Sequence, residues 1–269
     1  MIRLPAVAGQ FYPDNPGELS ALVRQYTLEN TKHEKVHAQA CLVPHAGYIY
    51  SGHVAGAVFS QLLLPKKIVI LGVRHYPRGE ALAIVSAGKW RTPLGDVPID
   101  RELAKRVSAA CPALREDQVA HSREHSLEVE LPFLQVLDPE FTFVPVAVGT
   151  IRYPELVEVG EGLARVLAER AEEILVVTSS DMNHYEDDER TRWKDRQAIE
   201  CIERVDASGL YEVCRREAIS MCGLGPAVVM LTALKKLGVK KGELQSYATS
   251  ADISGDRKRV VGYAGMIFG

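Results

Sequence analysis

The sequence has no long hydrophobic run, no surplus of basic residues and no closely spaced pair of cysteines. Its longest apolar stretches, such as 68–73 and 174–177, are far shorter than the roughly 20 residues that a membrane span needs. The 32 basic and 35 acidic residues give a net charge of −3 without a basic stripe, which argues against nucleic-acid binding. The first residues lack the sustained apolar stretch of a secretory signal. We therefore expect a cytoplasmic protein that binds neither nucleic acid nor membrane.

The five cysteines form an odd set without a CxxC pair, so a disulfide framework is not expected in a chain of 269 residues. We interpret Cys41, Cys111, Cys201 and Cys214 as inert, small hydrophobic residues. Cys222 differs because it directly precedes an apolar segment that we predict to be helical. A thiol at a helix N-terminus has a lowered pKa, and the thiolate binds metals or attacks electrophiles. The alternative is a cysteine that packs beside a glycine-rich turn.

Apolar β-rich runs alternate with amphipathic segments, a pattern that predicts a sheet covered by helices. Because the chain has no repeat, low-complexity tract or linker, we expect one α/β domain over residues 1–269. The predicted strands cover 40–43, 68–73, 82–85, 141–148, 174–178, 243–249 and 259–267. The predicted helices cover 54–63, 100–109, 126–136, 154–171, 190–203, 206–216 and 225–237, with Pro132 expected to kink or shorten the third.

Polar residues follow three of these strands at equivalent positions. His45 follows the strand 40–43, His75 follows 68–73, and Asp181 and His184 follow 174–178. If the strands are parallel and adjacent, these side chains emerge at the carboxyl edge of the sheet, where open α/β sheets bind ligands. A single histidine after a strand is more often a turn or capping residue. Three histidines at equivalent positions favour a shared site.

Asp181 and His184 stand three residues apart, so one turn of chain can bring the carboxylate and the imidazole together. Such a pair orients the ring and raises its basicity, as an acid/base histidine requires. The alternative is a helix N-cap with an exposed histidine.

A second dense polar run covers residues 121–130. His121 and His125 are four residues apart, as are Glu124 and Glu128, so a helix would place each pair on one face. The spacing resembles that of metal ligands but lacks the HExxH order. We expect His125 and Glu128 to orient the ligands from outside the coordination sphere or to position substrate. A solvated helix start is the alternative.

Several motifs, in order along the chain, resemble those of the Memo family, whose prokaryotic members are also called AmmeMemoRadiSam system protein B. They are PAVAGQFYP at 5–13, PHAGYIYSG at 44–52, EHSLE at 124–128, SSDMNHY at 179–185 and CG at 222–223. Together they extend over essentially the whole chain.

The resemblance implies a three-layer α/β/α domain with a mixed, largely parallel central sheet, similar to the fold of class III extradiol dioxygenases. In those enzymes two histidines and a glutamate hold Fe(II), and a further histidine acts as acid and base. By resemblance, His45 and His75 are metal ligands, and His184 is the acid/base histidine with Asp181 beside it. The third ligand position falls on Cys222, where the dioxygenases carry glutamate.

A thiolate in place of a carboxylate favours Fe(II), copper or zinc, and it adds a ligand that can itself be oxidised. We therefore expect a metal-binding protein that uses iron or copper for redox chemistry or metal handling, with zinc as a third candidate. One alternative is an extradiol-type dioxygenase that acts on a catechol-like substrate. Another is a non-catalytic module that binds a peptide or protein in the cleft, although no arginine cluster of the kind that favours phosphate recognition lies beside the motifs. The family label also implies association with a radical-SAM protein and an AMMECR-type protein.

Overall fold

The computed structural model describes residues 1–28, 35–169 and 173–269. The strands are β1 (Ile2–Arg3), β2 (Ala40–Val43), β3 (Lys67–Val73), β4 (Leu82–Ile84), β5 (Lys89–Thr92), β6 (Gly95–Pro98), β7 (Arg115–Glu116), β8 (Thr142–Val148), β9 (Ile174–Ser179), β10 (His184–Glu186), β11 (Gly242–Thr249) and β12 (Val260–Phe268). The helices are α1 (Pro16–Leu28), α2 (Tyr48–Phe59), α3 (Arg101–Ala110), the 3-10 helix η1 (Glu128–Glu130), α4 (Leu131–Leu137), α5 (Tyr153–Ala168), α6 (Asp188–Glu203), α7 (Ala207–Arg216), α8 (Leu224–Lys236) and α9 (Ala251–Ser254).

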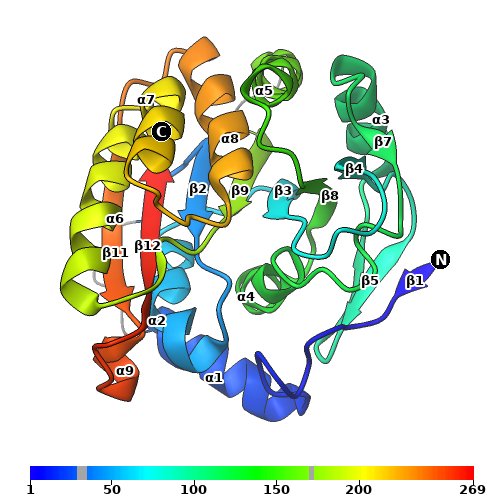
Figure 1. Cartoon of the computed structure of the whole chain (residues 1–269). Coiled ribbons are helices and arrows are strands. Elements are labelled where there is room, and N and C mark those ends of the chain that lie inside the picture. Colours follow the sequence, from blue (N-terminus) through cyan, green and yellow to red (C-terminus); the bar gives the residue numbers. More distant parts are fainter. Residues whose placement is uncertain (29–34, 170–172) are drawn as a thin grey trace.

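The main sheet is mixed and has a parallel centre (Figure 1). Within the described residues nine strands form it, in the order β10-β12-β2-β9-β3-β8-β4-β7, and β11 pairs with β12. The strands β2, β9, β3 and β8 run parallel to one another, whereas β12 and β4 run antiparallel to their neighbours in this central group. The carboxyl ends of the four central strands therefore meet at one edge.

Both faces of the central strands are buried by helices. Successive side chains of a strand point to opposite faces, so neighbouring residues of one strand belong to different hydrophobic cores. Leu42 belongs to a hydrophobic core shared with α3, α5, α6, α7 and α8, whereas the next residue, Val43, belongs to a core shared with α1, α2 and α4. In β3, Leu71 and Ile70 divide in the same way. Figure 1 shows these two groups of helices on opposite sides of the sheet. The predicted three-layer α/β/α fold is confirmed.

A small second sheet joins β1, β5 and β6, with β1 parallel to β5 and β5 antiparallel to β6. It lies at the right of Figure 1, near the N-terminus. The buried side chain of Trp90 in β5 packs against Phe143 of β8, with 5.4 Å between the ring centroids. This contact ties the small sheet to the main one.

The seven predicted strands are confirmed, each within one residue at either end. The helix predicted over 54–63 was misplaced, because α2 begins at Tyr48 and ends at Phe59. Its glycines weaken the helical signal of the sequence. They are nevertheless required, because a Cβ on Gly52 would lie 2.4 Å from a ring carbon of Tyr26 in α1, and one on Gly56 would lie 2.6 Å from the carbonyl oxygen of Tyr26.

The helix predicted over 126–136 was wrong at its start. Residues 121–127 form turns and irregular chain, followed by η1 and then α4. Pro132 lies in the first turn of α4, where its missing N–H breaks no helical hydrogen bond, so it neither kinks nor shortens the helix. The helix α1 had no counterpart among the predicted elements. The end of the helix predicted over 154–171 lies partly outside the described residues. In the described part of the chain, no helix is long and apolar enough to cross a membrane.

Candidate metal centre

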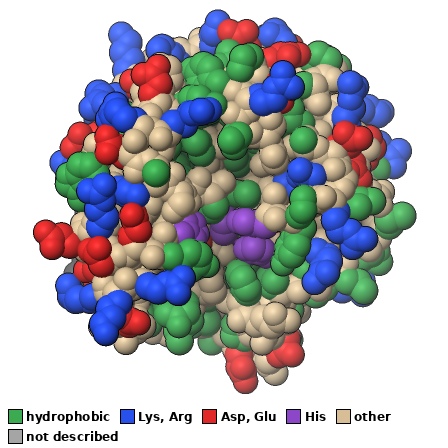
Figure 2. Space-filling model, in the orientation of Figure 1, with side chains coloured by type: hydrophobic (Ala, Val, Ile, Leu, Met, Phe, Trp, Pro, Cys, Tyr) green, Lys and Arg blue, Asp and Glu red, His purple; other side chains and the backbone are tan. Residues whose placement is uncertain are grey.

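The carboxyl ends of the adjacent parallel strands β2, β9 and β3 open into a cleft of about 620 Å³. Figure 2 shows the histidines gathered in a hollow near the centre of this face, with lysine and arginine side chains around it. Of the seven residues to which the sequence assigned a role, six line the cleft: His45, His75, His125, Asp181, His184 and Cys222.

Three imidazole rings form the centre of the cleft. His45, His75 and His125 each offer one nitrogen, and the three nitrogens lie within 4.8 Å of one another. The ring of His125 stacks on that of His75, with 4.6 Å between centroids and 14° between planes, and both rings present an edge or face to His45. Metal–imidazole bonds are about 2 Å long, so nitrogens at this separation can share one ion after small side-chain movements.

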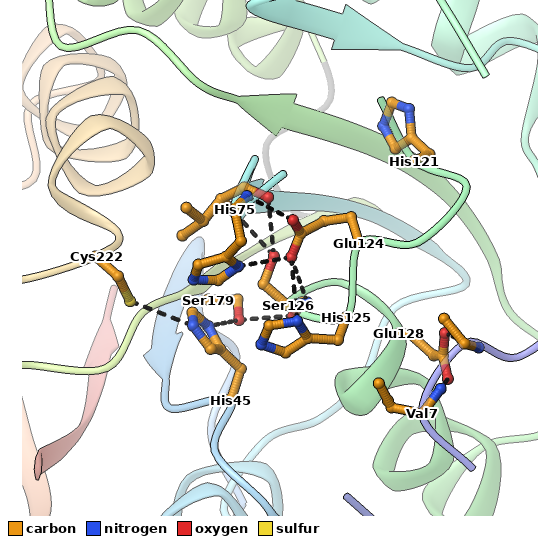
Figure 3. A network of polar contacts seen from close by, with 12 residues as sticks. Val7, His45, His75, His121, Glu124, His125, Ser126, Glu128, Ser179 and Cys222 are labelled. Atoms are coloured by element: carbon orange, nitrogen blue, oxygen red, sulfur yellow. Dashed lines mark hydrogen bonds and ion pairs between the residues drawn. The ribbon is translucent and has the colours of Figure 1, made fainter. Parts of the chain in front are cut away.

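His45 makes three polar contacts. Its backbone N–H donates to Oδ1 of Asp181 at 2.8 Å. Its Nδ1 lies 2.7 Å from Oγ of Ser179 (Figure 3). Nε2 lies 3.2 Å from Sγ of Cys222. The Ser179 hydroxyl also lies 2.7 Å from the carbonyl oxygen of Ser126 and 2.9 Å from Oε1 of Glu130. Cys222 is partly buried, and the other groups are fully buried.

The hydrogen bonds around Ser179 indicate where the protons of Glu130, Ser179 and His45 lie. Burial raises the pKa of Glu130 well above its usual range, so its side chain is a neutral carboxylic acid. A hydroxyl donates only once, and the Ser126 carbonyl can only accept, so Ser179 donates to Ser126. Ser179 then accepts from the Glu130 acid and from Nδ1–H of His45. This leaves Nε2 of His45 unprotonated toward the cleft, as a metal ligand requires.

Glu130→Gln will keep a donor to Ser179, because the amide N–H replaces the acid O–H. We expect near-native stability for this variant, whereas Glu130→Ala loses the donor, leaves a cavity and costs about 2 kcal/mol of unfolding free energy. Infrared difference spectra should show the C=O stretch of one protonated carboxylic acid that Glu130→Gln removes. If that band survives unchanged in Glu130→Gln, Glu130 is ionised and the proton assignment is wrong.

His75 is oriented by a buried carboxylate. Glu124 accepts from the backbone N–H of His75 at 2.6 Å and lies 2.8 Å from its Nδ1, and it also accepts from the N–H of Ser126 at 2.9 Å. Burial alone would raise the pKa of Glu124, but the contacts with His75 and Ser126 outweigh it and lower the pKa to about 2. The carboxylate therefore holds Nδ1–H of His75 and directs Nε2 into the cleft, as carboxylates do behind metal-binding histidines.

His125 completes the cluster with a looser contact to the same carboxylate, because Oε1 of Glu124 lies 3.7 Å from its Nδ1. Its ring lies between His75 and Phe11, whose centroid is 4.7 Å away, and its buried Nδ1 has no hydrogen-bond partner within the described residues. Burial and the neighbouring imidazoles lower the pKa of His45 to about 3 and that of His125 to about 4. Both rings are therefore neutral near pH 7, the form that binds metals. The sequence assigned His125 to a supporting role, and its position within the cluster makes it a candidate ligand as well.

The metal-free protein should lose stability on acidification. Unfolded imidazoles have a pKa near 6.5, so between pH 6.5 and about 4 the unfolded chain binds more protons than the folded one, and stability falls as the pH falls. The expected loss is about 2 kcal/mol per histidine between pH 6.5 and 5. Urea denaturation at several pH values measures it, and His125→Phe should reduce the dependence. Equal unfolding free energies at pH 7 and pH 5 would contradict these pKa values.

Cys222 lies in the turn that precedes α8. Its Sγ accepts from the backbone N–H of Asp181 at 3.3 Å and faces Nε2 of His45. The predicted lowering of its pKa was wrong, because burial and the nearby Asp181 carboxylate raise the pKa well above its ordinary value. The thiol in the metal-free protein is protonated and donates to His45. Gly223 allows this approach, since a Cβ there would lie 2.3 Å from Cβ of Ser180.

Asp181 and His184 do not form the predicted pair, because each makes a hydrogen bond with a different partner. Asp181 is buried and accepts from the N–H of His45, while burial raises its pKa against the influence of His184. His184 begins β10, and its Nδ1 lies 3.0 Å from the carbonyl oxygen of Ser220. Since a carbonyl only accepts, Nδ1 donates to it. The backbone carbonyl thus orients His184 in place of the carboxylate.

Glu128 does not line the cleft, although the sequence placed it beside the ligands or a substrate. Its buried carboxylate receives the N–H groups of Ala6 and Val7, the hydroxyl of Tyr12 and the guanidinium of Arg3. It anchors the N-terminal segment that carries Phe11 to the cleft. His121 also lies away from the cleft, because residues 121–127 do not form the helix that would place His121 and His125 on one face. The ring of His121 packs against Trp90, with 5.9 Å between the ring centroids.

The structure adds three buried groups to the site: Glu124, Glu130 and Ser179. Ser179 was visible in the sequence as a polar residue at the end of a buried strand. The burial of Glu124 and Glu130 was harder to predict, because charged residues interspersed with apolar ones are typical of an amphipathic helix, whose charged residues face water.

Comparisons with known proteins agree with the motifs. A family model described as Memo-like protein matches residues 3–267. A MEMO1 family protein of Methanopyrus kandleri is 41% identical over 280 residues, covering 100% of this chain and 99% of the relative. One of Aquifex aeolicus is 42% identical over 268 residues, covering 99% of each. An uncharacterized protein of Escherichia coli K12, known from a crystal structure, is similar with a TM-score of 0.55 at 14% identity, covering 85% of this chain and 98% of that one.

At 14% identity the likeness to the solved structure shows a shared fold and nothing further. The family model and the curated relatives extend over almost every residue of the chain, and most residues that line the cleft lie in the motifs that carry the resemblance. The chain belongs to the Memo family.

Proposed function

We propose that the cleft binds one transition-metal ion, iron or copper, with His45, His75 and Cys222 as ligands, and that the protein uses it for redox chemistry or metal handling. The observation that supports this proposal is the cluster of three imidazole nitrogens within 4.8 Å, with the thiol of Cys222 at 3.2 Å from His45. Two imidazoles and a thiolate suit Fe(II), copper or zinc. His125 offers a further neutral nitrogen on the same side.

The donor groups fit such an ion in their protonation as well as in their position. His45 and His75 each bind a protein oxygen through Nδ1, which directs Nε2 into the cleft. When bound, the metal would supply one-electron chemistry and a site for exogenous ligands. His184 lines the cleft and would exchange a proton with a bound molecule. Phe11 covers one side of His125 and limits the access of water.

The direct test is metal content. The protein, purified without chelators and loaded anaerobically with Fe(II), Cu(I) or Zn(II), should retain about one ion per chain of iron or copper after desalting. Elemental analysis of the triple variant His45→Ala, His75→Ala, Cys222→Ala should show none, with circular dichroism to confirm the fold. Unchanged metal content in the triple variant would overturn the proposal.

A dioxygenase activity is a second candidate, and the position of His184 favours it. His184 lines the same cleft as the three clustered imidazoles, as an acid/base group beside a metal must. Fe(II)-loaded protein, mixed with a panel of catechols under O₂, should then form yellow ring-opened products, and His184→Gln should abolish them. No product across a broad panel would count against this activity.

A role in binding a peptide or protein is a third candidate, favoured by the rim of the cleft. The sequence suggested no arginine cluster there, but the guanidinium of Arg259 lies 5.4 Å from the ring of Tyr185, which lines the cleft. Pulldowns with a radical-SAM protein and an AMMECR-type protein test this candidate. Binding that persists in the triple metal-site variant would favour it over a metal-dependent role.

A further inference from the structure

A second cavity, of about 460 Å³, lies between β1, β5 and the turn at 118–122, at the opposite end of the segment 121–125 from the metal cleft. Its walls are mostly apolar and include Ile2, Val85, Trp90 and Ile99. A cavity of this size with apolar walls and few polar groups is typical of small-molecule sites. The metal site described above uses none of these residues.

One polar side chain in the wall has an unmet hydrogen-bonding need. His121 lines the cavity and is 1% exposed. Its Nδ1 lies 2.9 Å from the carbonyl oxygen of Asp117, which can only accept, so Nδ1 carries the proton. Burial lowers the pKa of His121 to about 4, so Nε2 is an unprotonated acceptor near pH 7. Nε2 is buried and has no hydrogen-bond partner in the part of the chain that the structure describes. Such an acceptor is costly unless a donor reaches it.

The side-chain cations of the cavity wall are already neutralised or engaged. The guanidinium of Arg3 lies 4.1 Å from the centroid of the Trp90 ring and binds the carbonyl oxygens of His121 and Glu124 and the carboxylate of Glu128. Lys89 pairs with Asp96. Neither of these side chains is left to attract an anion, so the side chains of the walls favour a neutral molecule.

We propose that this cavity binds a small, neutral, largely apolar molecule that carries one hydrogen-bond donor, and that Nε2 of His121 accepts that hydrogen bond. The apolar walls bury the body of the ligand and the side of Trp90 contacts it. The site is distinct from the metal cleft and needs no metal.

Trp90 reports directly on the occupant. The chain has two tryptophans, so Trp193→Phe leaves Trp90 as the only one. Phenol and toluene have nearly the same shape, but phenol carries a hydroxyl, which can donate a hydrogen bond, where toluene carries a methyl group. Titration of each at millimolar concentrations, with excitation beyond their own absorption, should give saturable changes in Trp90 fluorescence.

The variant His121→Leu isolates the hydrogen bond. Comparing the ratio of phenol affinity to toluene affinity between variants cancels the different hydrophobicity of the two molecules. We expect His121→Leu to lower that ratio about tenfold while toluene still binds, which also shows that the cavity is intact. Ala87→Leu, which fills the cavity from its wall, should weaken both ligands. An unchanged ratio in His121→Leu, unchanged binding in Ala87→Leu, or no saturable binding would each overturn the proposal.

Discussion

Replacing His45 with alanine should raise the dissociation constant for iron and copper by more than about 100-fold, a larger effect than the 10- to 100-fold typical of residues that only orient a ligand. His45 contributes a pre-oriented nitrogen at the centre of the cluster, between the ring of His75 and the thiol of Cys222. Competition with a chromophoric chelator measures the affinity. His184→Ala is the matched control, because His184 lines the same cleft but is not a proposed ligand; it should retain metal binding.

The same titration identifies the third ligand. If Cys222 binds the metal, Cu(II)-loaded protein should show a thiolate-to-copper charge-transfer band that Cys222→Ser removes, and His125→Ala should lower the affinity only modestly. If His125 binds instead, His125→Ala should lower the affinity as strongly as His45→Ala does, and the band should be absent. Metal affinity in His45→Ala equal to that of the unmodified chain would show that the three imidazoles do not form the site.

Replacing Glu124 with alanine should cost about 3 kcal/mol of unfolding free energy and weaken metal binding about 10- to 100-fold. The carboxylate is fully buried and accepts from two groups of His75 and from the N–H of Ser126, so its removal leaves buried donors without acceptors. His75 then also loses the contact that fixes its ring. Denaturant unfolding and metal competition measure the two effects separately.

Glu128→Ala is the matched control for Glu124→Ala. Glu128 is equally buried and is four residues away, but it anchors Arg3, Ala6 and Tyr12 in place of a cleft histidine. We expect a similar loss of stability with a much smaller effect on metal affinity. Equal losses of metal affinity in both variants would mean that Glu124 acts through general stability and does not position His75.

The parts of the fold that the sequence predicted are those with a strong local signal. Central strands such as Ile174–Ser179 are continuous apolar runs because helices cover both of their faces, so a single segment identifies them. Because these strands are parallel neighbours, His45 and His75, which follow two of them, meet at the same edge of the sheet. Helix boundaries were less accurate where tertiary contacts override local propensity, as at Gly52 and Gly56 of α2, which pack against Tyr26.

The parts that the sequence did not predict depend on partners far away in the chain. Glu124 and Glu128 share a spacing of four residues, yet one orients His75 and the other anchors the N-terminal segment, because the chain between them is a turn. The proton on Glu130 depends on its burial and on the single hydrogen of Ser179, neither of which is visible in composition or periodicity. The cluster of histidines was predictable because several strands end at the same edge of the sheet, whereas the hydrogen-bond network behind it needed coordinates.

The wide separation of the proposed metal ligands along the chain has a consequence for folding kinetics. His45 and Cys222, whose side chains lie 3.2 Å apart, are separated by 177 residues, and the last strand, β12, inserts beside the strand that ends before His45. Non-local pairings of this kind form slowly, because loop closure must precede them. A nascent or truncated polypeptide that lacks residue 222 cannot present the full donor set. Uptake of metal at the proposed site during refolding would therefore follow the late pairing of these distant segments, and it would not report early collapse.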